Sequence, residues 1–292
     1  MKWIAPSLFD VIALSLPRGL SFGDNPPVGA WLSDDDATCG ALTQNGQSGA
    51  YGVLIMRRRV DEVWCVLRRE DNSLTKDQAM AAIREQLEEQ SMQVPLPPGA
   101  RRRAPLWDAR NVEPSQIFRA LASPTRRVGA WMLSQLYLAL PNPDQNWASD
   151  CQTGNFHTRL WEAQLLASFR EQGLLVTQDY QSPDFCVSNR HGGEAWIEAV
   201  TANPVERYEH YGAEPMDPPQ EQRERVLGNA AVRFAKTIRN KLDKRYDTLP
   251  HVVGKPFALA LADFHAPGSM LWSREALVGY LYGLFARVVE RD

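Results

Sequence analysis

Three carboxylate residues, Glu162, Asp184 and Glu198, stand in an order that could support metal chemistry. Glu162 lies in a segment with helical character, Asp184 follows a proline, and Glu198 interrupts the apolar run Trp-Ile-Glu-Ala-Val. An unpaired carboxylate in an apolar strand is costly to desolvate, so a metal ion or a basic partner should compensate for Glu198. Hard oxygen ligands suit Mg²⁺ or Mn²⁺, which could activate a water and screen a phosphate. The residues therefore predict a site for phosphodiester hydrolysis.

The segments that carry these carboxylates predict that they converge. Asp184 opens a short strand, Gly192 and Gly193 form a turn, and the following strand bears Glu198. A hairpin of this length places Asp184 and Glu198 near the same end of a sheet. Side chains alternate between the two faces of a strand, so Glu198 and Val200 point the same way.

The whole chain reads as two domains of different class. The polar, turn-rich stretch 141–156 is the boundary candidate. We expect a smaller α+β accessory domain over residues 1–145, with a role in recognition or dimer formation. Residues 146–292 should form an α/β domain whose central mixed sheet is flanked by helices. The expected elements are a β-meander (28–70), helices (75–90, 114–122, 127–140, 157–172, 220–246, 273–290), strands (174–179, 256–263), a hairpin (184–200) and loops (95–105, 204–219).

The ordered pattern of a helix glutamate, a Pro-Asp pair, a hairpin and a strand glutamate resembles the PD-(D/E)XK nuclease superfamily. The resemblance covers roughly residues 157–264 and implies a restriction-endonuclease-like fold. The matching site positions are Glu162, Asp184 and Glu198. The chain is divergent, because Val200 occupies the position of the motif lysine. In some members a nearby helix supplies that basic residue, and the candidates here are Lys236, Lys241 and Lys244, of which Lys241 is preferred.

The resemblance implies a metal-dependent endonuclease acting on DNA rather than RNA, in phage defence or DNA processing. Asp184 and Glu198 would hold Mg²⁺ or Mn²⁺, Glu162 would orient a metal-bound water, and Lys241 would stabilise the developing charge. Val200 motivates the alternative of a catalytically inactive nuclease-fold protein that binds nucleic acid or a protein partner. A third possibility is a structural subunit of a larger assembly. Taken singly, each carboxylate has an ordinary structural explanation, so the hypothesis rests on their combination.

Composition narrows the partners without identifying one. The 292 residues carry a formal net charge of −3, so any nucleic-acid partner requires a local basic surface. The segment 220–246 carries an excess of basic residues that could contact a phosphate backbone or simply face solvent. Shorter arginine clusters lie at 57–59, 101–103 and 126–127. The glycines form neither a phosphate loop nor a dinucleotide fingerprint, which argues against an ATPase or a Rossmann oxidoreductase.

The cysteines and the apolar segments indicate where in the cell the protein is located. The four cysteines are scattered without a CxxC motif, which is typical of reduced thiols in a cytoplasmic protein. The apolar N-terminus is interrupted by Pro6 and Asp10 and resembles a signal peptide poorly. The sequence contains no long apolar run of the kind that spans a membrane. We therefore expect a cytoplasmic protein without a membrane partner, as a homodimer or part of a larger assembly.

Overall fold

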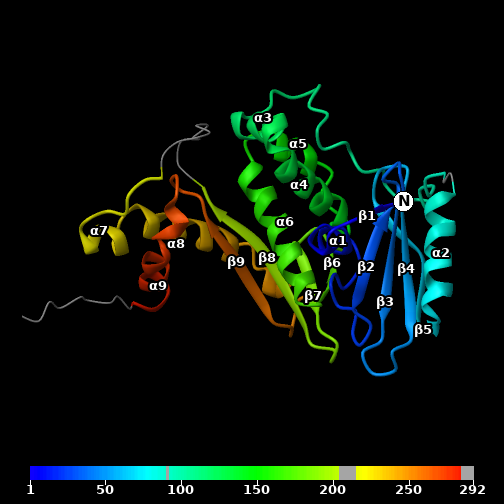
Figure 1. The fold of residues 1–292 in the computed structure, drawn as a ribbon. Coiled ribbons are helices and arrows are strands. Elements are labelled where there is room, and N and C mark those ends of the chain that lie inside the picture. The colour runs from blue at the N-terminus through cyan, green and yellow to red at the C-terminus, as the bar shows by residue number, and fades with distance from the viewer. Residues whose placement is uncertain (90–91, 204–214, 284–292) are drawn as a thin grey trace, which may run out of the picture.

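The computed structural model describes residues 1–89, 92–203 and 215–283. It is a mixed α/β structure with two sheets, one antiparallel and one mixed (Figure 1). Helices lie between and around these sheets. Within the described ranges, every helix is too short or too polar to cross a membrane.

The first sheet is the predicted β-meander. Its five antiparallel strands follow chain order: β1 (Lys2–Trp3), β2 (Pro27–Leu32), β3 (Thr38–Gln44), β4 (Tyr51–Arg58) and β5 (Trp64–Leu74). Helix α1 (Pro6–Ala13) covers one face and α2 (Lys76–Glu88) the other. Both faces are therefore buried, which explains the unbroken apolar run within β4. Thr75 and Gln78 form a reciprocal capping box that starts α2.

A helical layer joins the two sheets. It contains α3 (Gln116–Leu121), the 3₁₀ turn Pro124–Arg126, α4 (Arg127–Ala139), α5 (Trp147–Gln152) and α6 (Phe156–Glu171). Helix α5 lies within the polar stretch 141–156 that the sequence indicated as the domain boundary. The Trp147 ring is 1% exposed and stacks on Tyr137 at 4.7 Å between centroids. Burial of these aromatic rings outweighs the polar composition of the segment.

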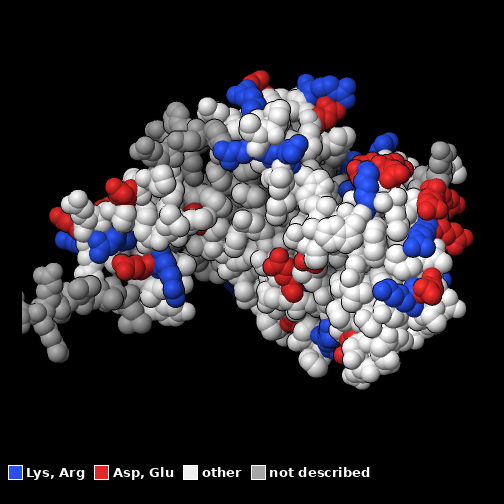
Figure 2. Space-filling view, viewed as in Figure 1, with Lys and Arg blue, Asp and Glu red and all other residues white. Residues whose placement is uncertain are grey.

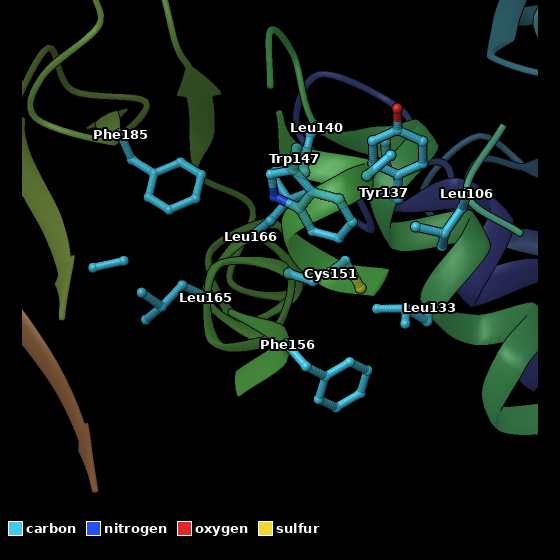
Figure 3. Close-up of a cluster of buried hydrophobic side chains, with 14 of the residues drawn as sticks. Leu106, Leu133, Tyr137, Leu140, Trp147, Cys151, Phe156, Leu165, Leu166 and Phe185 are labelled. Atoms are coloured by element: carbon cyan, nitrogen blue, oxygen red, sulfur yellow. The ribbon is translucent and has the colours of Figure 1, made fainter. Parts of the chain in front are cut away.

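One hydrophobic core unites this layer with the second sheet (Figure 3). It contains Leu133 from α4, Cys151 from α5, Leu166 from α6 and Phe185 from the second sheet. The predicted domain division at residue 145 lies between α4 and α5, and side chains from both sides of it share this core. Residues of the helical layer that precede the division thus help to position the candidate site.

The second sheet is mixed, with the order β6 (Leu175–Thr177), β7 (Phe185–Ser188), β8 (Glu194–Ala202) and β9 (Phe257–Asp263). The β6–β7 and β7–β8 pairs are antiparallel, whereas β8 and β9 are parallel. Side chains of β8 alternate between the two faces of the sheet. Ala199 lies in the core shared with α6, and Ala202 packs with Phe234 of the C-terminal helices on the other face. Helices thus flank this sheet on both faces, as the sequence predicted.

The C-terminal helices are α7 (Gln222–Leu227), α8 (Asn229–Leu242) and α9 (Arg274–Tyr282), with short 3₁₀ helices at Tyr246–Thr248 and Ser269–Leu271. The single long helix predicted for 220–246 is broken at Gly228. A Cβ atom at Gly228 would lie 2.3 Å from the Glu224 carbonyl oxygen, so the break requires glycine. The residues expected to complete a loop over 204–214 and a helix over 284–290 lie outside the described residues.

Candidate active site

The hairpin of β7 and β8 brings two of the predicted carboxylates together. Phe185 pairs with Ile197, so Asp184, which directly precedes β7, lies opposite Glu198. The Asp184 Oδ2 atom accepts a hydrogen bond from the Ala199 backbone N–H at 2.7 Å. This bond ties the Asp184 side chain to β8 and leaves Oδ1 without a hydrogen-bond partner among the residues that the structure describes. The two carboxylates therefore lie side by side where β7 begins, next to the middle of β8.

The second carboxylate, Glu198, is buried and only half satisfied. Its side chain lies on β8 and the residue is 3% exposed. The Oε1 atom accepts hydrogen bonds from Lys241 Nζ at 2.5 Å and from the Tyr246 hydroxyl at 2.8 Å. The Oε2 atom is buried and finds no hydrogen-bond partner in the described parts of the chain. Buried polar atoms are rarely left in this state, so Oε2 is available to accept a hydrogen bond or to coordinate a cation.

The basic partner of Glu198 comes from a helix rather than from β8. Val200, at the position of the expected lysine, is 2% exposed, as an apolar core residue should be. Lys241 lies in the last turn of α8, which packs against β8 and so carries the ammonium group to Glu198. Among the three candidate lysines, Lys241 is the one that the structure pairs with this carboxylate; the Lys244 ammonium lies 5.9 Å from the ring centre of Tyr246.

The third predicted carboxylate, Glu162, is held by its own partners. It is 5% exposed on α6, where Oε2 accepts a hydrogen bond from Trp147 Nε1 at 2.8 Å. Its Oε1 atom accepts one from Arg159 Nη1 at 2.7 Å. The same guanidinium also lies 2.5 Å from Asp150 and 3.5 Å from Asp144. Both Glu162 oxygens accept hydrogen bonds from protein groups. Glu162 therefore anchors the Arg159 side chain.

Electrostatics couple the three carboxylates. The pKa of Asp184 is raised to about 8: burial is the largest cause and the negative charges of Glu198 and Glu162 add to it, while the Ala199 N–H and Lys241 oppose the shift. Burial also raises the pKa of Glu162, although the Arg159 guanidinium and the Trp147 N–H lower it. Burial and the hydrogen bond to Glu198 likewise raise the pKa of Tyr246. Excess negative charge in so small a volume favours a bound cation.

A cavity of about 340 Å³ opens onto Asp184 and Glu162. Its charged lining consists of four carboxylates and two arginines: Asp144, Glu162, Asp179, Asp184, Arg101 and Arg159. Glu198 and Lys241 are not among the described residues that line it, in keeping with the burial of Glu198. A ligand in the cavity would thus reach the carboxylate pair from the side of Asp184.

The donor set fits a hard divalent ion such as Mg²⁺ or Mn²⁺. No cluster of three or more His, Cys, Asp and Glu side chains within the described ranges is arranged as a ready metal site. Mg²⁺ is usually held by one or two carboxylates, with waters and substrate phosphates completing its shell. Asp184 and Glu198 each have one oxygen anchored to the protein, and the other oxygen of each has no hydrogen-bond partner among the described residues.

The raised pKa of Asp184 predicts a specific pH dependence of stability. Its pKa of about 8 in the folded protein exceeds the ordinary value of 3.8, so protonation of Asp184 stabilises the fold below pH 4 and this contribution disappears as the pH rises through 8. Between pH 6 and 9, in metal-free buffer, the wild type should lose on the order of 2 kcal/mol more unfolding free energy than Asp184→Asn. Urea unfolding at both pH values measures this. Equal losses in the two proteins would contradict the assignment.

The arginine clusters differ in how exposed their side chains are and in which groups they contact. The Arg57, Arg58 and Arg59 side chains are only 11–13% exposed and form ion pairs with Glu89, Glu62 and Asp61. Arg103 donates to the Leu140 and Pro141 carbonyl oxygens, whereas Arg101 is exposed. Of the described residues, Lys and Arg on the face shown in Figure 2 form separate groups among acidic residues and make no continuous basic surface there.

Sequence reasoning missed several residues that shape this site. Arg159 precedes Glu162 by one helical turn, so the spacing of opposite charges along α6 could have identified the pair. Trp147 precedes the region of the motif and Tyr246 lies at the end of the basic segment 220–246, and nothing in their local sequence pairs them with a carboxylate. Tyr180 and His251 stack on each other at the rim of the cavity although 71 positions of sequence separate them.

Comparison with known proteins does not assign the chain to a class. No family model, no curated protein and no solved structure matches it.

Proposed function

We propose that this chain is a divalent-metal-dependent hydrolase of phosphodiester bonds in DNA, with a divergent PD-(D/E)XK arrangement on a restriction-endonuclease-like domain. The observation that carries the proposal is the pair of carboxylates on adjacent strands, Asp184 and Glu198, each with one anchored and one free oxygen. The pairing of Lys241 with Glu198 supports it further, because a basic group beside the acidic pair completes the set that the chemistry needs.

Asp184 and Glu198 would hold the ion. When bound, Mg²⁺ or Mn²⁺ lowers the pKa of a water and neutralises phosphate charge. The Ala199 N–H and the Tyr246 hydroxyl fix the two carboxylates, so that their free oxygens stay in place. Lys241 compensates the buried charge of Glu198 and adds positive charge behind the carboxylate pair.

Glu162 takes a positioning role in this proposal. Its carboxylate holds the Arg159 guanidinium beside the cavity that opens onto Asp184. The acidic balance of the cavity lining opposes entry of a polyanion, and a bound cation removes part of this repulsion. The proposal thus links DNA binding at this site to the presence of a divalent ion.

The alternative is a nuclease-fold protein that binds nucleic acid or a protein partner without cleavage. Two observations favour it: Val200 stands where the motif lysine is expected, and both oxygens of Glu162 are engaged by protein groups. In this alternative the carboxylates are structural. Salt-dependent DNA binding without cleavage would be its signature.

Incubation of plasmid and single-stranded DNA with the protein tests the proposal. With Mg²⁺ or Mn²⁺ we expect nicked, linear or shortened products, and with EDTA we expect none. A preparation of Asp184→Ala, made in parallel, excludes a contaminating nuclease. Intact DNA with either metal across these substrates, together with salt-dependent binding, would replace the proposal by the binding alternative.

A further inference from the structure

The exposed aromatic ring of Tyr180 lies at the rim of the cavity that Asp184 lines. Tyr180 lines this cavity and remains 51% exposed. One face of its ring stacks on His251, with centroids 3.8 Å apart and planes at 7°. The edge of the pair meets Trp196, whose ring centroid lies 5.6 Å from that of Tyr180. Tyr180 is thus supported from behind while a large part of its surface faces solvent.

The support for this ring is fixed by the loop that leads to Asp184. His251 Nε2 donates a hydrogen bond to the Ser182 carbonyl oxygen at 2.8 Å. Ser182 lies two residues before Asp184, so the aromatic stack and the carboxylate are tied to the same short segment. An aromatic ring held in this way offers a binding surface at little cost in conformational entropy.

The polar lining beside Tyr180 is suited to the edges of a nucleobase. Four carboxamides line the cavity: Asn142, Gln145, Gln178 and Gln181. The Asn142 backbone N–H donates to Gln178 Oε1, and Asn142 Nδ2 donates to the Gln178 carbonyl oxygen. Among the described residues, the Gln178 amide nitrogen and the Asn142 amide oxygen form no hydrogen bond, so both can bond to a ligand. Carboxamides provide both a donor and acceptors, which match the Watson–Crick and Hoogsteen edges of bases.

A second cavity extends this site toward a more basic region. It has a volume of about 410 Å³ and shares Arg101, Asn142 and Asp179 with the first cavity. Its charged lining has four arginines against two aspartates: Arg59, Arg101, Arg102, Arg103, Asp144 and Asp179. Arg101 is exposed and forms no hydrogen bond or ion pair within the described part of the chain. A phosphate that follows a base on Tyr180 would find its countercharge there.

From these observations we propose that Tyr180 stacks on an unpaired base, and that the substrate is therefore single-stranded or locally unpaired nucleic acid. The inference rests on the proposed function, since the stacked base would neighbour the phosphodiester held at Asp184. A base inside a duplex has both faces covered by its neighbours, so an internal base must leave the helix before it can stack on Tyr180. Base–aromatic stacking tolerates any sequence, because every base has a π-face.

Fluorescence anisotropy with a labelled oligothymidylate tests this inference. Ca²⁺ replaces Mg²⁺, and a gel confirms that the strand stays intact. Tyr180→Ala should weaken binding about tenfold, because it removes the ring on which the base stacks. Tyr180→Phe keeps the ring and should bind within about twofold of the wild type. The matched control is Tyr280→Ala on α9, an exposed tyrosine outside both cavities, which should bind as the wild type does.

A strand of abasic sites separates stacking from general damage to the site. The wild type should bind it more weakly than oligothymidylate, and Tyr180→Ala should cause no further loss. Unchanged oligothymidylate binding by Tyr180→Ala would overturn the inference, as would equal loss on both strands or tighter binding of a blunt duplex. These binding outcomes are independent of cleavage. If the wild type does not cleave DNA with a divalent metal, the proposed hydrolase activity is overturned. Whether binding depends on the Tyr180 ring tests the stacking separately.

Discussion

Asp184→Asn is expected to lower metal-dependent DNA cleavage by about 10³-fold while leaving the protein folded. Asparagine keeps an oxygen that can accept the Ala199 N–H bond, so the geometry of the hairpin should survive. It removes the charge that Asp184 contributes opposite Glu198, and the remaining carboxylate alone is a weak ligand for a hard divalent ion. Initial rates on a fluorescent DNA substrate at saturating Mn²⁺ measure the effect.

Glu194→Gln is the matched control for this substitution. Glu194 lies on the same strand as Glu198, but it is partly exposed, and it pairs with Lys255 at 2.6 Å. The same chemical change at Glu194 should leave the rate within about twofold of the wild type. If Asp184→Asn cleaved DNA as fast as Glu194→Gln, the carboxylate pair would have no part in the reaction.

Arg159→Ala is expected to destabilise the fold by about 3–5 kcal/mol, because it leaves the buried Glu162 carboxylate without its countercharge. Arg159 is 12% exposed at its side chain and contacts Glu162, Asp150 and Asp144. Urea unfolding with a constant slope of the transition provides the measurement. Arg119→Ala removes an exposed pair with Glu113 and should leave the midpoint unchanged.

A second substitution separates the lost charge from the lost packing. Glu162→Gln removes the stranded carboxylate, so Arg159→Ala combined with Glu162→Gln should be more stable than Arg159→Ala alone. Simple loss of packing would make the two effects add instead. Additivity within error would therefore exclude the buried-charge explanation for Arg159.

The sequence predicted the elements whose pattern is local. The β-meander of β2–β5, helix α2 and the hairpin of β7 and β8 all appear where they were expected. The preference for Lys241 also agrees with its contact in the structure, because α8 is amphipathic and its buried face sets which lysine reaches β8. The convergence of Asp184 and Glu198 followed from hairpin length alone.

The remaining features depend on tertiary packing. Gly228 breaks the helix of 220–246 because the chain turns against Glu224, and no periodicity reveals such a turn. Helix α5 forms in a polar segment because Trp147 finds a buried place against Tyr137. The Arg57–Arg59 run looked like a basic surface, yet each guanidinium forms an ion pair. Arg57 pairs with the sequence-distant Glu89, whereas Arg58 and Arg59 pair with acidic residues four and two positions further along the chain. Such pairings exist only after the chain has folded.

A calorimetric titration of the metal-free protein with Mn²⁺ tests the central claim most directly, namely that Asp184 and Glu198 form a divalent-metal site. The account predicts saturable binding by the wild type and by Glu194→Gln. Asp184→Asn and Glu198→Gln should each weaken the affinity at least about tenfold. Equal Mn²⁺ affinity in all four proteins, or no binding by the wild type at millimolar Mn²⁺, would contradict it.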